Sequence, residues 1–190
     1  SSTFEMTKEY VEANPNGWTD IPEYIFLMNP EVDGVAIGHP VADCPVITVQ
    51  DQKSGRVALA HCSADLIDKY LPTMIVETLL REGSKERDLL VNVAPFAGND
   101  WTYDRMPGWA TDEQLWRDAI VLNEDTGLYH IDLMSALDKQ FSRLGLAGNQ
   151  VIYSPNDTIL DSRYYSNSQA RQNPSKGGRQ IEGVVFQKTR

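Results

Sequence analysis

Two short apolar segments joined by a polar loop constrain the fold of this chain more than any other feature. They lie at about residues 45–50 and 56–61, and the five-residue loop between them ends in Gly55. A loop of this length that contains glycine is typical of a β-hairpin. Cys44 precedes the first strand and His61 ends the second, seventeen positions later (61 − 44). Because hairpin partners lie side by side, the pattern predicts that Cys44 and His61 converge at one end of the hairpin.

A cysteine and a histidine in this position are candidates for catalysis in two ways. They can share a metal ion, or they can form a thiolate–imidazolium pair in which the histidine activates the sulfur. Cys62 follows His61 directly, and neighbouring side chains of a strand point to opposite faces. We therefore expect Cys44 and His61 to be the functional pair and Cys62 to be structural.

Composition excludes several classes of protein. The chain has 190 residues, of which 41% are hydrophobic and 23% charged, enough for the core of one domain. It holds no apolar stretch of the roughly 18 residues that a membrane span needs. Its formal net charge is −10, from 27 acidic and 17 basic residues. Such an acidic chain lacks the excess of basic residues that binds the phosphates of nucleic acids. With two cysteines and no charged-then-apolar leader, we expect an intracellular, cytoplasmic chain.

Hydrophobic patterning predicts an α+β fold with a mixed sheet in a single domain, because strands outnumber helices and alternate irregularly with them. The predicted strands lie at about 24–28, 33–38, 45–50, 56–61, 89–94, 151–153 and 181–186, and the predicted helices at 72–83, 112–120 and 133–144. Residues 154–179 form a polar stretch that is too long for an ordinary connection, and such loops are usually functional or mobile. We expect this stretch to border the Cys44/His61 site.

Several motifs in order along the chain resemble the laccase-domain family, also called YfiH-like or multicopper polyphenol oxidase-like and linked to peptidoglycan editing. The resemblance covers about residues 32–187. The motifs are Asp33-Gly34-Val35, Ala42-Asp43-Cys44-Pro45-Val46, Ala60-His61, Ala94-Pro95-Phe96-Ala97-Gly98, Trp101-Thr102-Tyr103-Asp104, Tyr129-His130-Ile131-Asp132-Leu133, Tyr165-Ser166 and Gly178-Arg179-Gln180.

The resemblance implies a mixed-sheet sandwich with helices, also related to a cysteine-hydrolase-like fold. It implies a zinc site of two histidines and one cysteine, and phosphorolysis or deamination of purine nucleosides such as adenosine or inosine. Carried over by position, Cys44 and His61 would be two of the three zinc ligands, and Tyr165 and Arg179 lie in motifs of the resemblance. We expect Arg179, Arg171 and Tyr165 to contact the small-molecule substrate, since the forked donors of a guanidinium suit a phosphate or carboxylate. Residues 31–190 would form the laccase-domain-like unit, preceded by residues 1–30 as an N-terminal extension or a truncated family N-terminus.

The third metal ligand needs a different source in this chain. The family's first metal histidine falls where this chain has Thr7-Lys8-Glu9-Tyr10, so His39 or a carboxylate such as Asp43 would complete the set. A multicopper centre is excluded by counting, because it needs roughly ten histidines and the chain has three.

Two other functions stay open at this stage. Related folds place a nucleophilic cysteine and a base histidine at nearly this spacing, so a metal-free amidase or deamidase would use Cys44 and His61 alone. A catalytically inactive relative would keep the fold as a binding module.

Further chemically active residue types have structural explanations. We expect His130 to be a hydrogen-bonded strand residue. Trp101, Trp109 and Trp116 fit a core better than a base-stacking wall.

Overall fold

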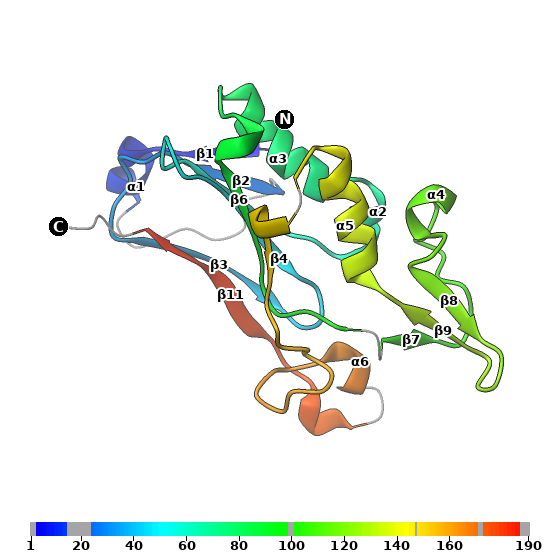
Figure 1. The fold of residues 1–190 in the computed structure, drawn as a ribbon. Coiled ribbons are helices and arrows are strands. Elements are labelled where there is room, and N and C mark those ends of the chain that lie inside the picture. Colours follow the sequence, from blue (N-terminus) through cyan, green and yellow to red (C-terminus); the bar gives the residue numbers. More distant parts are fainter. Residues whose placement is uncertain (1–2, 15–23, 99–100, 147, 171–172, 187–190) are drawn as a thin grey trace.

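A six-stranded mixed sheet forms the centre of the fold (Figure 1). The computed structural model describes residues 3–14, 24–98, 101–146, 148–170 and 173–186. In spatial order the strands are β1 (Thr3–Met6), β2 (Ile25–Met28), β5 (Val57–His61), β4 (Val46–Asp51), β6 (Leu89–Val93) and β10 (Val151–Tyr153). The β1–β2 and β6–β10 pairs are parallel and the other pairs antiparallel. The predicted hairpin is therefore confirmed as β4–β5, at the middle of the sheet.

Helices cover one face of this sheet. They are α2 (Ala64–Asp68), α3 (Leu71–Arg81) and α5 (Leu133–Arg143). Pro72 lies in the first turn of α3, where its missing N–H costs nothing. The carboxylate of Asp132 caps α5 by accepting a hydrogen bond from the N–H of Ser135. Alternate strand residues such as Ile47 and Val49 pack with these helices in the larger of two hydrophobic clusters.

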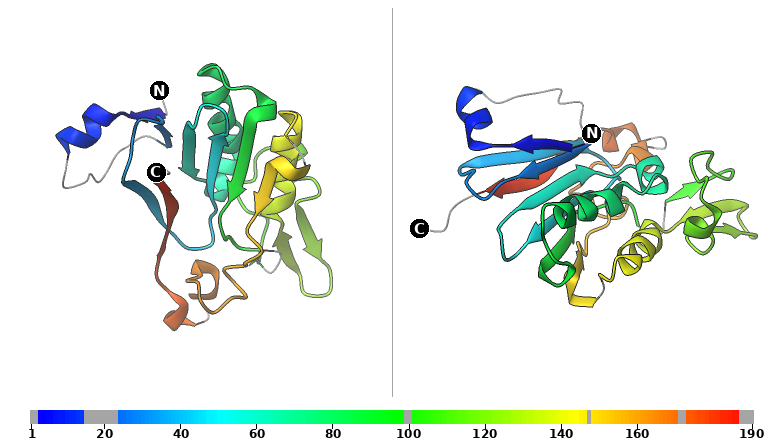
Figure 2. Two further views of the ribbon diagram at one scale, coloured as in Figure 1. Left: turned by 60° about the vertical axis from the view of Figure 1, so that its left-hand side comes forward. Right: turned by 90° about the horizontal axis from the view of Figure 1, so that it is seen from above.

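A two-stranded antiparallel ribbon covers the opposite face of the sheet (Figure 2). It pairs β3 (Val35–Val41) with β11 (Gln180–Phe186), segments from opposite ends of the chain. The inward residues Val35 and Ile37 join Val46 and sheet neighbours in the smaller hydrophobic cluster. The chain is thus layered as helices, sheet and ribbon.

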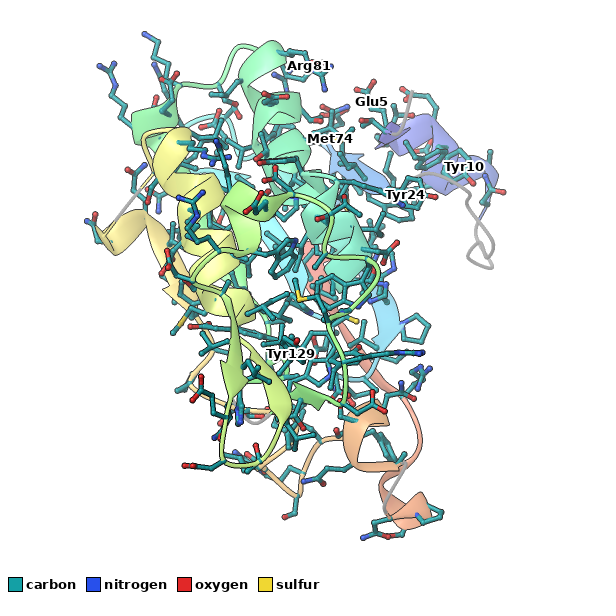
Figure 3. All side chains as sticks on the ribbon, turned by 90° about the vertical axis from the view of Figure 1, so that its right-hand side faces the viewer. Glu5, Tyr10, Tyr24, Met74, Arg81 and Tyr129 are labelled. Carbon is teal, nitrogen blue, oxygen red and sulfur yellow. The ribbon has the colours of Figure 1, made fainter. Side chains whose placement is uncertain are left out.

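A third, three-stranded sheet lies at one end of the molecule. It contains β7 (Thr102–Tyr103), β9 (Leu128–Ile131) and β8 (Ile120–Asn123). Figure 3 shows Tyr129 on β9, far from Arg81 at the last turn of α3. The remaining helices are α1 (Lys8–Ala13), α4 (Glu113–Trp116) and α6 (Asn167–Ala170), with 3₁₀ turns at Glu86–Asp88, Gly148–Gln150 and Pro174–Lys176.

The predicted fold class, α+β with a mixed sheet, is confirmed. One element differs: the helix expected over 112–120 ends at Trp116, and Ile120 begins β8. The described part of residues 1–30 contributes β1 and β2 to the central sheet. Among the described residues, none of the helices has the length and apolar character needed to cross a membrane.

Candidate functional site

The β4–β5 hairpin brings Cys44 and His61 to the same end of the central sheet. His61 is the register partner of Val46, and Cys44 lies two residues before Val46. The N–H of Cys62 donates to the carbonyl of Pro45 at 2.9 Å, which continues the pairing toward Cys44. The charges of Asp65 and Arg179 also influence the pKa of both Cys44 and His61. The hairpin therefore places the two predicted residues in one electrostatic environment.

The Cys44 thiol is held in its protonated form. Burial raises its pKa to about 11, and the carboxylates of Asp43 and Asp65 act in the same direction. The guanidinium of Arg179 and the backbone N–H of Ala64 oppose this shift without cancelling it. A metal-free thiolate is therefore scarce at neutral pH in this environment.

The two histidines nearest the site are neutral imidazoles. Burial lowers the pKa of His61, and burial together with the neighbouring His61 lowers the pKa of His39. Their ring centroids lie 6.0 Å apart, and Phe26 contacts His39 edge-on at 5.4 Å. The Nε2 atom of His39 is buried and has no hydrogen-bond partner among the residues that the structure describes. Neutral imidazole is the form that binds metals.

The residues fit a zinc ion only in part. Zn–N bonds of about 2.0–2.1 Å place the centroids of two rings on one tetrahedral ion roughly 5 Å apart, close to the His39–His61 separation. Within the described ranges, however, no three side chains of His, Cys, Asp or Glu are grouped so that they could hold a metal. The set of ligands is therefore incomplete in this geometry.

Asp43, the alternative third ligand, has both carboxylate oxygens occupied. The hydroxyl of Thr158 donates to Oδ1 at 2.8 Å, and the N–H of Ser168 donates to Oδ2 at 2.7 Å. The side chain is buried, and its backbone φ of 81° is unusual for a residue other than glycine. Asp43 thus connects the turn that carries Cys44 to the late polar segment, and strained residues of this kind cluster at functional sites.

The segment 154–179 borders the site, as predicted. Besides Thr158 and Ser168, it supplies Arg179, whose exposed guanidinium acts on both Cys44 and His61. The guanidinium also donates to the carbonyl of Gly178 at 2.8 Å.

The other two predicted substrate residues are not brought to Cys44 by any described contact. Tyr165 is largely exposed, and its ring packs so closely on Gly178 that a Cβ there would meet it at 2.6 Å. Its N–H donates to Oε1 of Gln180. Arg171 lies outside the described residues.

Glu182, which was not among the predicted site residues, lies opposite His39 in the β3–β11 register. Its carboxylate accepts from Nε2 of Gln180 at 3.2 Å, and the nearby backbone of Val46 acts to lower its pKa. Burial raises the pKa of Glu182 to about 7. The signal was a lone acid at an inward position of an otherwise apolar strand, which becomes visible once the register is known.

The structural explanations for five other residues are confirmed. Cys62 is fully buried in the larger hydrophobic cluster, and His130 is a strand residue of β9. Trp101 and Trp116 are buried in the same cluster, and Trp109 packs against it and stacks on Trp101.

Comparisons with known proteins agree with this fold. A family model described as multi-copper polyphenol oxidoreductase laccase matches residues 28–187. The hypothetical protein YfiH of Bacillus licheniformis has a TM-score of 0.73 and 16% identity, covering 97% of this chain and 70% of that one. YlmD of Geobacillus stearothermophilus has a TM-score of 0.78 and 20% identity, covering 98% and 70%.

A third similar structure is the protein NMB0706 of Neisseria meningitidis, described with the family model DUF152. Its TM-score is 0.67 and its identity 16%, over 87% of this chain and 65% of that one. At such identities these three likenesses establish the fold alone. A comparison with curated proteins found no match.

Proposed function

The chain belongs to the multi-copper polyphenol oxidoreductase laccase family, and from this premise we propose that it processes purine nucleosides by phosphorolysis or deamination. The single observation that supports this most is that Cys44 and His61 share one end of the β4–β5 hairpin and that the charge of Arg179 acts on both. Two of them come from the β4–β5 hairpin and the third from the late polar segment. A cation, a neutral imidazole and a buried thiol at one place suit polar bond cleavage better than packing.

His61 and Arg179 have separable roles in this proposal. A neutral imidazole accepts a proton from an attacking water or phosphate and returns it to the leaving nitrogen. In phosphorolysis a phosphate oxygen bonds to C1′ of the ribose while the bond from C1′ to the base breaks, and its electron pair leaves with the base. The forked guanidinium of Arg179 suits the phosphate, whose charge it would offset.

Zinc stays a prediction of the family resemblance. Cys44, His61 and His39 are the residues that would hold it, and a bound zinc would lower the pKa of a water ligand. The ligand set for this ion is incomplete among the described residues in this geometry.

The metal-free amidase is less well supported. It requires a thiolate beside an imidazolium, which means a lowered cysteine pKa and a raised histidine pKa. Cys44 and His61 are shifted in the opposite directions. The arrangement therefore favours a histidine-based reaction over a cysteine nucleophile.

The test is turnover of adenosine and inosine with and without phosphate, followed by chromatography of the products. Phosphorolysis gives a free base and ribose 1-phosphate, whereas deamination of adenosine gives inosine and ammonia. His61→Ala should abolish either reaction, and His130→Asn, on β9 of the separate three-stranded sheet, serves as the matched control. Folded protein that turns over neither nucleoside would contradict the proposal and leave the binding-module alternative.

Metal content is measured on the same preparations. Protein purified without chelator should carry less than one equivalent of zinc, because two strong ligands rarely hold it well. Stoichiometric zinc that survives dialysis would show a complete ligand set, and His39→Ala would then be the first variant to examine.

A further inference from the structure

Two buried polar atoms without partners face each other across the β3–β11 ribbon. They are Nε2 of His39 and Oε2 of Glu182, which no atom of the described residues reaches by a hydrogen bond. His39 and Glu182 are direct register partners, so their side chains lie on the same face. The Glu182 residue is only 8% exposed. A native fold seldom leaves such atoms unpaired, and each instance asks for an explanation.

The inward face of the ribbon divides into an apolar part and a polar part. Val35, Ile37 and Val184 pack toward the central sheet, as an inward strand face should. Farther along, His39, Glu182 and Gln180 take inward positions beside the buried Val41, so this part of the face is mostly polar. Apolar side chains at the positions of His39 and Glu182 would bury equally well without unpaired atoms, so packing does not explain their polarity.

This polar part adjoins the proposed reaction site. The backbone of Val46 is near enough to the Glu182 carboxylate to lower its pKa, and Val46 is the register partner of His61. The rings of His39 and His61 lie 6.0 Å apart. Glu182 and His39 therefore lie between the sheet and the ribbon, next to the ring of His61.

The unpaired atoms of Glu182 and His39 limit which groups a ligand can present to them. Oε1 of Glu182 already accepts from Gln180, so Oε2 is the oxygen that needs a donor. The neutral ring of His39 offers Nε2 as either a donor or an acceptor. A ligand that satisfies both atoms needs one firm donor and a neighbouring group that can donate or accept.

We propose that Glu182 and His39 form a subsite for two neighbouring hydroxyl groups, the 2′- and 3′-hydroxyls of a ribose. One hydroxyl donates to Oε2 of Glu182, and the other pairs with Nε2 of His39, an atom that in this arrangement does not bind zinc. A hydroxyl both donates and accepts, so the pairing holds for either tautomer of the imidazole. Acidic side chains recognise ribose hydroxyls in this way in other nucleotide-binding folds. The proposal rests on the proposed function, because it assigns the sugar of the nucleoside to a place beside His61.

The test measures binding of adenosine and of 2′,3′-dideoxyadenosine by calorimetry, with the wild-type chain and Glu182→Gln. We expect wild-type protein to bind adenosine at least tenfold more tightly than the dideoxy analogue. Glu182→Gln should reduce this preference to less than threefold and leave the affinity for the analogue unchanged. Glu124→Gln, an exposed turn position, is the matched control and should keep the wild-type preference. A preference that survives Glu182→Gln in folded protein would overturn the subsite.

A second variant keeps the test decisive if Glu182→Gln does not fold. His39→Asn removes the other half of the subsite and should reduce the same preference. An unchanged preference in folded His39→Asn would overturn the proposal.

D-ribose and 2-deoxy-D-ribose separate the subsite from the proposed function. If the protein binds no nucleoside but binds ribose in preference to deoxyribose, and Glu182→Gln removes that preference, the nucleoside function fails and the subsite stands. If it binds nucleosides with no preference for the hydroxyls, the subsite fails and the function stands.

Discussion

The central sheet and the β3–β11 ribbon differ in the kinds of side chain that they bury. In the sheet, β2 and most of β5 are buried along their whole length, and apolar residues fill both faces. In the ribbon, the outward residues Ile181 and Val185 are 74% and 69% exposed, whereas Glu182 between them is buried. Burial in a packed core explains the apolar residues of the sheet. It does not explain the two polar residues His39 and Glu182 on the inward face of the ribbon.

The sharpest way to test this contrast is to shorten one isoleucine in each region. Ile47→Ala, at a fully buried position of β4, should lower the free energy of unfolding by about 2–5 kcal/mol, since it loses burial and opens a cavity. Ile181→Ala, on the outward face of β11, should change it by less than about 0.5 kcal/mol. Urea denaturation of both variants measures the difference. Equal losses would mean that the outward face of the ribbon is covered in solution.

Glu182→Gln should raise stability at alkaline pH and not at acid pH. The folded-state pKa of Glu182, about 7, lies above its ordinary value of 4.5, so the fold resists ionisation and loses stability as pH rises through this window. Removing the charge should recover about 2–3 kcal/mol above pH 8 and nearly nothing at pH 4.5. Denaturation across this pH range, with Glu124→Gln as control, gives the difference between variant and wild type. A gain that is the same at every pH would contradict the buried charge.

Asp43→Asn tests the connection between the Cys44 turn and the late segment. An amide keeps one acceptor for Thr158 but presents a donor to the N–H of Ser168, so one charge-assisted hydrogen bond is lost. We expect a loss of about 1.5 kcal/mol, and faster hydrogen exchange at the Ser168 amide. Asparagine tolerates a positive φ, so backbone strain does not complicate the result. Asp125→Asn, in an exposed turn, should have neither effect.

Arg179→Ala should have the smallest effect on stability, below about 0.5 kcal/mol, because its guanidinium is exposed. It should still raise the pKa of the Cys44 thiol, since Arg179 is the cation that opposes the rise. Rates of alkylation by iodoacetamide against pH measure this, with Arg105→Ala as the control. Fully buried Cys62 should not react in folded protein. An unchanged alkylation profile would remove Arg179 from the site.

The fold was predictable wherever local pattern and short connections decide it. The β4–β5 hairpin, α3, α5 and β6 all follow from periodicity, breakers and loop length. The hairpin also delivers Cys44 and His61 to one end of the sheet, so the centre of the site was within reach of the sequence.

Elements that are short or lack a buried stripe were not predictable. β7 has two residues, and the β8 residues Val121 and Leu122 are exposed, so neither strand leaves an alternating pattern. Helix α2 follows Ser63 immediately and has five residues, too few for periodicity to show.

The outer parts of the site depend on pairings that no local pattern contains. Glu182 becomes a site residue only through its register with His39, from the opposite end of the chain. The role of Asp43 depends in the same way on Thr158 and Ser168. The register between strands that are far apart in the sequence depends on the whole tertiary structure, so local sequence patterns do not predict it.

The two hydrogen bonds of Asp43 also determine when in folding the site can form. They join Asp43 to residues 115 and 125 positions later in the sequence. Each bond therefore requires the closure of a very large loop. Contacts of such high order form slowly, and during synthesis they wait until Ser168 has left the ribosome. A partly made chain can therefore hold the β4–β5 hairpin with Cys44 and His61 while lacking the segment that brings Arg179 to them. A complete site therefore forms only when nearly the entire chain has folded.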